Sequence, residues 1–106
     1  MGKPEGNLAT RVDEWFRKQP DIFCFNVHGN QMQRRGIPDR VGTVGSIGFW
    51  IELKKPGGGP TPIQRGVHRK IARAGGNVRV CRSLSEVQEF IEELRSLALD
   101  RVGAFL

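Results

Sequence analysis

The stretch 47-IGFWIELKKPGGGP-60 begins as a hydrophobic strand and then carries an acid and a base, Glu52 and Lys54, two residues apart. Side chains alternate between the two faces of a strand, so one face of this segment is apolar and the other is not. The apolar face consists of Ile47, Phe49, Ile51 and Leu53. Glu52 and Lys54 lie together on the opposite face, with Trp50. We therefore expect one face to build the core and the other to carry a polar site.

Glu52 needs a partner, because an unpaired charge in so hydrophobic a strand is costly to bury. Lys54 is one candidate, and an acid–base pair on an exposed sheet face is common and contributes little to stability. A hard divalent cation is the other candidate, since such ions prefer carboxylate oxygens. The cation would require a second carboxylate close to Glu52.

Asp39 is the residue that could supply this second carboxylate. Residues 22–85 include eleven Lys and Arg residues and only two acids, Asp39 and Glu52, a local charge of +9. Asp39 follows 36-GIP-38, in which Gly36 and Pro38 favour a tight turn. Such a turn would bring Asp39 near Glu52 on a neighbouring strand, although an ordinary turn residue fits the same pattern.

The charge distribution also indicates the kind of partner. The whole chain has a net charge of +6 and a pI near 10.2, while its two ends are acidic. A basic middle between acidic ends favours a face that binds a polyanion, most simply nucleic acid, over a solvated basic surface without a partner.

Hydrophobic spacing and turn residues predict seven elements. Gly45-Ser46 separates two β-prone runs, so we expect a hairpin of Arg40 to Val44 with Ile47 to Lys54. Capping boxes at 61-TPIQ-64 and 83-SLSE-86 open two helices, the first ending at about Ala74. The other elements are a helix from Pro4 to Lys18, strands at 22–27 and 77–82, and, on the last helix, an apolar stripe of Leu84, Val87, Phe90, Ile91, Leu94 and Leu97. The order helix, three strands, helix, strand, helix predicts an α/β fold with a mixed central sheet flanked by helices.

Length and composition set the class of protein. The 106 residues suit one domain and are too few for two, so we expect a single domain over residues 1–106. Cys24 and Cys81 lack metal-binding or C-x-x-C spacing and are expected to be free buried thiols. The sequence shows no secretory leader and no run of eighteen apolar residues, so we expect a cytoplasmic protein that does not enter a membrane.

The polar residues around the first-quoted strand resemble those of a known nuclease superfamily. The segment 36-GIPD-39, then 51-IELK-54, then Gln64 at the start of a helix resemble, in order and spacing, the PD-(D/E)xK nucleases. Within that superfamily the chain is most similar to the virus-type replication-repair nuclease family, VRR-NUC. The likeness extends to 5-EGNLATRVDEWF-16, 26-NVHG-29 and 74-AGGNVRVCRSLSEV-87. It implies a restriction-endonuclease-like core and a Mg²⁺- or Mn²⁺-dependent DNA endonuclease.

This resemblance implies a role for each residue of the motif. Asp39 and Glu52, with the backbone carbonyl of Leu53, would hold Mg²⁺ or Mn²⁺. Lys54 would position or polarise the attacking water and stabilise charge on the phosphate. Gln64 would orient this group of residues from the adjacent helix.

Three further assignments stay open at the level of sequence. Gln64 completes a capping box with Thr61 and need do nothing else, although it can both cap the helix and face the site. Glu5 matches the acid of the family's first helix and would reach the metal through water, but Glu14 competes for this role. His28 follows a strand and is more often a structural residue at such a position.

Basic residues near the motif are expected to hold DNA phosphates on both sides of a cut. They are Arg34, Arg35, Arg40, Lys55, Arg65, Arg69, Lys70 and Arg73. No base-reading motif stands out, so we expect recognition of DNA structure rather than of sequence.

Family members that consist of this domain alone resemble Holliday junction resolvases. The likeness implies a homodimer that cuts branched DNA in phage recombination or repair, within the bacterial cytoplasm if the protein is phage-encoded. The tail 102-VGAFL-106 and the first helix could supply the dimer surface, or the tail could cover the protein's own core. Two other classes stay open: a basic nucleic-acid-binding module without catalysis, and a nuclease subunit whose partner supplies specificity.

Overall fold

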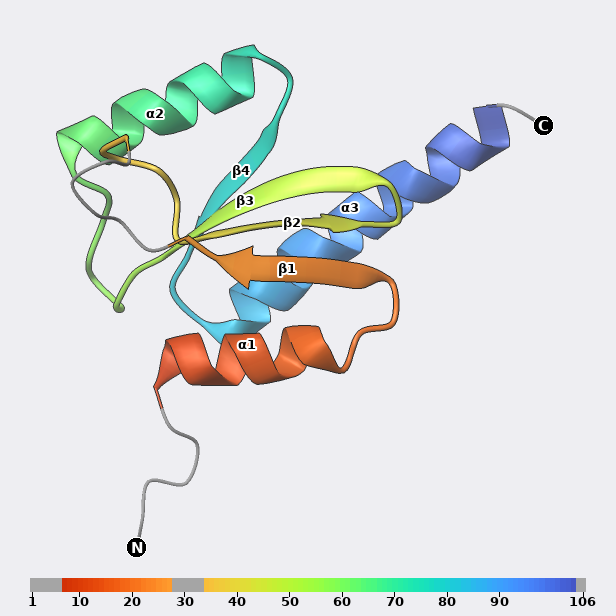
Figure 1. The fold of residues 1–106 in the computed structure, drawn as a ribbon, viewed down its shortest axis with the longest axis horizontal. Coiled ribbons are helices and arrows are strands. Elements are labelled where there is room, and N and C mark those ends of the chain that lie inside the picture. The colour runs from red at the N-terminus through yellow and green to blue at the C-terminus, as the bar shows by residue number, and fades with distance from the viewer. Residues whose placement is uncertain (1–6, 28–33, 105–106) are drawn as a thin grey trace, which may run out of the picture.

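The described part of the chain forms helices and strands in the order that the sequence predicts (Figure 1). The computed structural model describes residues 7–27 and 34–104, with side chains up to residue 101. The elements are α1 (Leu8–Arg17), β1 (Ile22–Asn26), β2 (Arg40–Val44), β3 (Ile47–Leu53), α2 (Pro62–Arg73), β4 (Asn77–Cys81) and α3 (Leu84–Ala104). None of these helices is both long and apolar enough to cross a membrane.

The four strands form one mixed sheet in the order β1-β2-β3-β4. β1 pairs with β2 and β2 with β3 in antiparallel fashion, while β4 pairs with β3 in parallel. α2 is the crossover that connects the two parallel strands and lies against β4. α1 and α3 pack on the other face of the sheet (Figure 1). The predicted mixed α/β architecture is confirmed.

The β2–β3 hairpin fixes the register on which the site depends. Val44 pairs with Ile47, which leaves Gly45 and Ser46 as a two-residue loop with φ angles of +54° and +75°. Positive φ at both central residues is the pattern of a type I′ turn, whose twist matches that of the flanking strands. The predicted hairpin is confirmed, and β3 ends at Leu53, one residue earlier than expected.

The core lies between the sheet and the two helices α1 and α3. Phe49 is fully buried at its centre; its ring stacks on Phe16 of α1 at 5.8 Å between centroids and meets Phe90 of α3 edge-on at 6.4 Å. The other buried residues of this cluster are Val12, Val44, Ile47, Ile51, Cys81, Val87, Ile91 and Leu94. The alternation predicted for β3 is therefore confirmed. Leu97 is an exception to the stripe predicted on α3, since it is 45% exposed.

The helix starts differ in detail from the prediction. α1 begins at Leu8 rather than Pro4, because the Asn7 side chain accepts a hydrogen bond from the Thr10 N–H at 2.8 Å and caps the helix there. Its first turn contains no acid, and Glu5 lies outside the described residues. On α2 the predicted capping box of Thr61 and Gln64 is present in both directions.

At α3 the capping pattern is split between two residues. The Ser83 hydroxyl accepts from the Glu86 N–H at 3.1 Å, as predicted. The Glu86 carboxylate, however, accepts from the Arg82 N–H at 2.6 Å, one residue before the expected donor.

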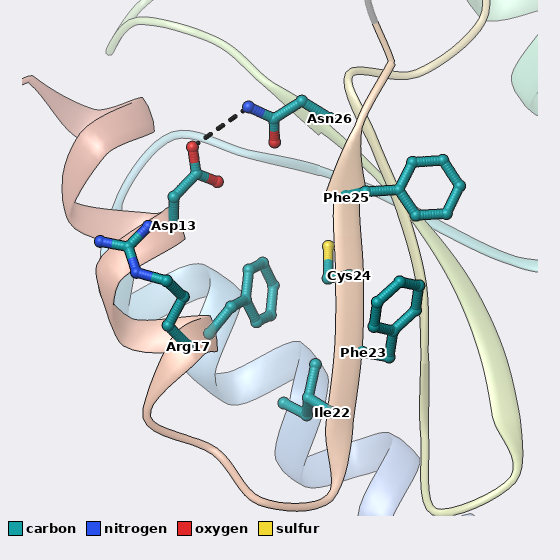
Figure 2. Close-up of a pocket in the computed structure, with 8 residues that line it drawn as sticks. Asp13, Arg17, Ile22, Phe23, Cys24, Phe25 and Asn26 are labelled. Carbon is teal, nitrogen blue, oxygen red and sulfur yellow. Dashed lines mark hydrogen bonds between the residues drawn. The ribbon is translucent and has the colours of Figure 1, made fainter.

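β1 forms the outer edge of the sheet and has two unlike faces (Figure 2). Ile22 and Cys24 point toward α1, whereas Phe23 and Phe25 point away from it and are 69% and 52% exposed. A groove of about 510 Å³ runs along this edge between β1 and α1. Cys24 is half-buried and Cys81 is buried, and both are free thiols, as predicted.

Candidate functional site

Asp39 and Glu52 face each other across the ends of two neighbouring strands. Arg40 pairs with Ile51, so extending the register by one residue places Asp39 opposite Glu52. Cross-strand neighbours have their side chains on the same face. The two acids of the basic middle region thus meet on the face of the sheet opposite the core, as the sequence predicts.

Glu52 is buried, with only 1% of its surface exposed. Its carboxylate oxygens lie 3.4 Å from Gln64 Nε2 and 3.3 Å from His68 Nε2. Burial is the largest cause that raises the pKa of Glu52, and the neighbouring Asp39 carboxylate adds to it while the Lys54 ammonium opposes both; together they bring this pKa to about 8. In the protein alone, therefore, Glu52 is largely protonated at neutral pH.

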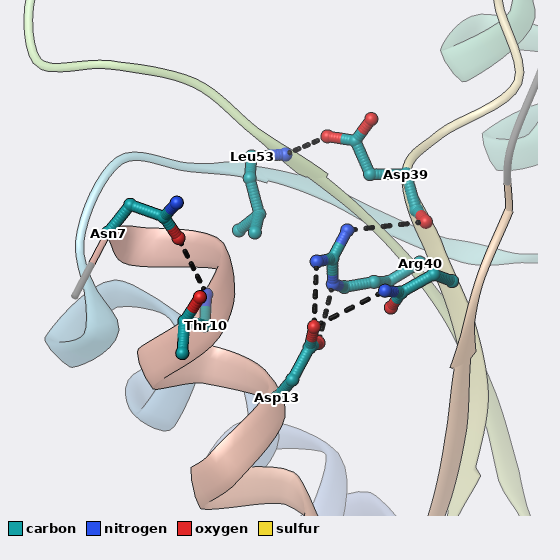
Figure 3. Close-up of polar contacts among 7 residues, drawn as sticks. Asn7, Thr10, Asp13, Asp39, Arg40 and Leu53 are labelled. Carbon is teal, nitrogen blue, oxygen red and sulfur yellow. Dashed lines mark hydrogen bonds and ion pairs between the residues drawn. The ribbon is translucent and has the colours of Figure 1, made fainter.

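Asp39 is held at the end of the β2–β3 ladder by a backbone hydrogen bond. Its Oδ2 accepts from the Leu53 N–H at 2.8 Å (Figure 3). Within a strand, the N–H and C=O of one residue point toward the same neighbouring strand. The Leu53 carbonyl is therefore expected on the Asp39 side of β3, where the resemblance puts a metal ligand.

Lys54 and Gln64 both reach the same small region. The Lys54 ammonium is close enough to lower the pKa values of both Glu52 and His68. Gln64 uses its two ends separately: Oε1 accepts from the Thr61 N–H at 2.9 Å, and Nε2 donates to Glu52. The two interpretations of Gln64, as a helix cap and as a residue facing Glu52, are therefore both correct.

His68 was not identified from the sequence, although a signal was present. It follows Gln64 by four residues on α2, so both side chains lie on the same helix face. Burial and the nearby Lys54 lower the pKa of His68, so it contacts Glu52 as a neutral imidazole. His28, which the sequence did suggest, lies outside the described residues.

The residues at this point fit a hard divalent cation. Two carboxylates lie side by side, one of them buried and destabilised as an anion by the other, so a positive ion would relieve the repulsion. Asp39, Glu52 and the Leu53 carbonyl are all oxygen donors of the kind that Mg²⁺ and Mn²⁺ accept. Among the residues that the structure describes, no group of three or more His, Cys, Asp or Glu side chains is arranged to hold a metal. The protein would thus supply two carboxylates, with a backbone oxygen and water completing the set.

Arg40 is placed differently from the prediction that it binds phosphate. It is 7% exposed, on the core face of β2, and its Nε and Nη2 donate to the Asp13 carboxylate at 2.9 and 3.1 Å (Figure 3). Asn26 donates to the same carboxylate at 3.3 Å. This pair of a buried Arg40 and a half-buried Asp13 joins α1 to the sheet, so Arg40 is a structural residue. Glu14, the alternative acid on α1, is exposed.

The other predicted phosphate-binding residues are exposed to solvent. They are Arg34, Arg35, Lys55, Arg65, Arg69, Lys70 and Arg73. Four of them lie on α2, the helix that also carries Gln64 and His68. Arg82 holds the connection between β3 and α2, since its Nε donates to the Gly58 carbonyl at 2.7 Å.

Comparison with known proteins bears on the architecture. No family model matches the sequence, and no curated protein matches it. Among solved structures, the chain is similar to one described as "VRR_NUC domain", with a TM-score of 0.69 and 24% sequence identity over 86% of this chain and 97% of that one. The class defined by the sheet and its helices is the restriction-endonuclease-like α/β fold. More particularly, the chain has the fold of a VRR-NUC domain, as the sequence resemblance predicts.

Proposed function

We propose that the protein is a metal-dependent DNA endonuclease of the VRR-NUC type that hydrolyses phosphodiester bonds in branched DNA. The observation that carries this proposal is the meeting of Asp39 and Glu52 beside Lys54, under the helix that bears Gln64. The fold that the chain shares with a VRR-NUC domain also supports a nuclease.

The side chains divide the chemistry among them. Asp39 and Glu52, with the Leu53 carbonyl, would hold Mg²⁺ or Mn²⁺, which when bound reduces repulsion at the phosphate and lowers the pKa of a bound water. Lys54 offers a fixed positive charge where negative charge grows on the phosphate in the transition state. Gln64 keeps the Glu52 carboxylate oriented from α2.

His68 adds a second fixed contact to Glu52. Its Nε2 lies 3.3 Å from the carboxylate, on the oxygen that Gln64 does not contact. A ligand whose two oxygens are both held keeps a single orientation, and such support commonly affects metal affinity. We assign His68 as a positioning residue.

The exposed cations would hold DNA on either side of the site. Arg65, Arg69, Lys70 and Arg73 form a series along α2, and Arg34, Arg35 and Lys55 lie on the segments that precede β2 and follow β3. Contacts of this kind go to phosphates and carry no sequence information. They fit an enzyme that recognises the shape of DNA.

The free thiols Cys24 and Cys81 are compatible with the reducing cytoplasm as its location.

A homodimer is part of the proposal, and the buried apolar residues of the first helix already pack within the protein itself. Val12 and Phe16 of α1 are buried in the protein's own core, and the side chains of residues 102–106 lie outside the described residues. The outer edge of β1, with exposed Phe23 and Phe25, is the surface that better fits a second copy.

One observation favours a second candidate function. Only two acidic side chains meet at the site within the described residues, fewer than the three-ligand groups of many metal centres. A nucleic-acid-binding module that keeps the nuclease fold without cleaving DNA would account for this.

Cleavage assays separate the two functions. Labelled four-way junctions, flaps, splayed arms and linear duplexes would be incubated with the protein in Mg²⁺, Mn²⁺ or EDTA. We expect metal-dependent cuts near branch points, and a loss of cleavage on the order of 100-fold or more in Glu52→Gln with DNA affinity retained. Lys18→Gln, a substitution at the exposed C-cap of α1, is the matched control. If the protein binds these substrates but cleaves none of them in either metal, the result would support the non-catalytic binding module instead of the nuclease.

A further inference from the structure

A second pocket opens beside the candidate nuclease site, and none of that site's residues lines it. Its volume is about 570 Å³, and its walls come from β3, α2, the turn before β4, the segment before β2 and the end of α3. The larger apolar residues that line it are Ile37, Ile47, Trp50, Val67 and Ile71. A cavity of this size accommodates a small organic group such as a nucleotide.

The wall around Trp50 is fixed by close packing. A side chain at Gly76 would lie 2.9 Å from Trp50 Cζ3 and 2.6 Å from Ile71 Cγ2, so only glycine leaves room for both. On the adjacent part of the sheet, Asn77 Nδ2 donates to the Gly48 carbonyl at 3.0 Å, and both residues also line the pocket. The pocket is therefore built in advance of any ligand.

The described charged residues that line this pocket are cations. Arg34, Lys70 and Arg101 line it together with the apolar group, and no acidic residue is among the described lining residues. Several cations favour an anion, and an indole ring favours a flat aromatic partner. A nucleotide combines both properties in one molecule.

Trp50 places this pocket next to Glu52, where the proposed cleavage would occur. Trp50 and Glu52 lie two residues apart on the same face of β3, which corresponds to about 7 Å along the strand. A base inside a duplex is stacked and cannot enter such a pocket unless it is unpaired or extruded. We propose that the pocket binds an unpaired nucleotide adjacent to the cleaved phosphodiester, with its base against Trp50 and its phosphates near the three cations. This inference rests on the proposed function for the position of the cut, and it names the DNA feature that the enzyme selects.

Trp50 fluorescence tests the pocket without requiring cleavage. The chain has two tryptophans, so Trp15→Phe leaves Trp50 as the single emitter. With EDTA present, addition of single-stranded oligo(dT) should quench this emission in a saturable way, at lower concentration than dTMP or paired duplex. Unchanged emission while anisotropy shows that DNA is bound would overturn the proposal. Equal affinity for dTMP and the oligonucleotide would also overturn it, because the site would then be one for free nucleotides.

Substitutions at the pocket test its link to substrate choice. Trp50→Leu should reduce affinity for a junction with one unpaired nucleotide at the branch about tenfold, with little effect on a fully paired junction. Because Trp50 also packs against Gly76, the pair Lys70→Gln and Arg101→Gln tests the same pocket from its exposed rim and should lower the salt dependence of binding by one or two phosphate contacts. Lys18→Gln should behave as the unmodified protein.

The two proposals fail in different ways. If the variants cleave paired and unpaired branches in the same ratio as the unmodified protein, the pocket assignment is wrong and the nuclease stands. If the unmodified protein cleaves nothing, the nuclease assignment is wrong, while quenching of Trp50 still decides what the pocket binds.

Discussion

At the scale of single residues, Glu52 illustrates a conflict between stability and function. It is a buried carboxylate placed beside a second one, and none of the described residues places a cation within hydrogen-bonding distance of it. Folding places Glu52 where its anion is disfavoured, so its folded-state pKa of about 8 lies well above its ordinary value of 4.5. Such an arrangement does not favour the stability of the folded protein, and it is the arrangement expected of a site that binds a cation.

A stability measurement in EDTA tests this account of Glu52. A raised folded-state pKa stabilises the protein fully below pH 4.5, and this contribution is lost as pH rises toward 8. The free energy of unfolding should therefore fall by on the order of 2–4 kcal/mol between pH 5 and 8. Glu52→Gln, which is neutral throughout, should lack this fall and be the more stable protein at pH 8.

Chemical denaturation at a series of pH values gives the comparison. Glu89→Gln, an exposed substitution on α3, is the control and should keep the pH dependence of the unmodified protein. If the free energy of unfolding changed with pH in the same way for the unmodified protein and Glu52→Gln, the burial and repulsion argued for Glu52 would be contradicted.

At the scale of elements, α2 and the turn before β2 are docked on each other to complete the site. Gly36 has a φ of +86°, and a Cβ there would lie 2.8 Å from Ile63 Cγ2 and 2.9 Å from Val67 Cγ2, both on α2. This contact sets the distance between Asp39, three residues further on, and the helix that bears Gln64. Glycine is required at this position for two reasons, the backbone angle and the close approach.

Gly36→Ala should therefore damage both stability and cleavage. We expect a loss of roughly 2–3 kcal/mol in the free energy of unfolding, from strain and overpacking together, and a loss of activity larger than the unfolded fraction explains. Thermal melts and cleavage rates of the folded protein would be compared.

The chain offers a matched control for Gly36. Gly57 has a similar φ of +82°, but nothing lies within 4 Å of a Cβ at that position. Gly57→Ala should thus show only the backbone penalty, about 1 kcal/mol, and near-normal cleavage. Equal effects of the two substitutions would mean that the docking of α2 on the turn is unimportant.

The elements also show what sequence reasoning could reach. The meeting of Asp39 and Glu52 was predictable because a two-residue hairpin loop fixes the register, and the two roles of Gln64 followed from a capping box. The contact of His68 with Glu52 depends on how α2 docks, which local patterns do not encode. Arg40 was misplaced because its partner, Asp13, lies 27 residues away on a different element.

Two details of the helices also differ from the prediction, one residue of the stripe on α3 and the start of α1. Leu97 fits the helical period of the stripe on α3 but is 45% exposed, while its neighbour Ala98 packs against the core. The start of α1 depended on which of several polar residues caps the helix, and Asn7 does.

At the scale of the whole molecule, one edge of the sheet is available to a partner. β1 is the outer strand on the side away from β4, and its exposed Phe23 and Phe25 lie 5.9 Å apart between ring centroids. If two copies pair antiparallel through β1, the two-fold axis is perpendicular to the sheet, and both candidate sites lie on the same side. Five strand spacings, roughly 24 Å, would separate the two β3 strands, and the two Glu52 residues would also lie at opposite ends of their strands. Two cuts on opposite strands of one junction would suit that arrangement.

Solution mass tests this dimer. Phe23→Ser together with Phe25→Thr should convert a dimer into a monomer without touching the core, since both side chains are exposed. Light scattering gives the mass, and mapping of junction cuts should show that paired symmetric cleavage becomes single nicking. Leu99→Ser, which removes an equally exposed side chain from α3, is the control. A monomeric unmodified protein, or a dimer unaffected by the double substitution, would exclude β1 as the interface.

The parallel pairing of β3 with β4 affects when a newly made chain can complete the candidate site. The β2–β3 hairpin assembles from neighbours in sequence, whereas β4 can join only after the whole crossover has left the ribosome. Until then α2 is not docked on the sheet, and Gln64 and His68 are not held in contact with Glu52. A half-synthesised chain would thus carry the acidic pair without the residues that orient it, so a chain with the proposed nuclease activity would not cleave nearby nucleic acid until residue 81 has left the ribosome.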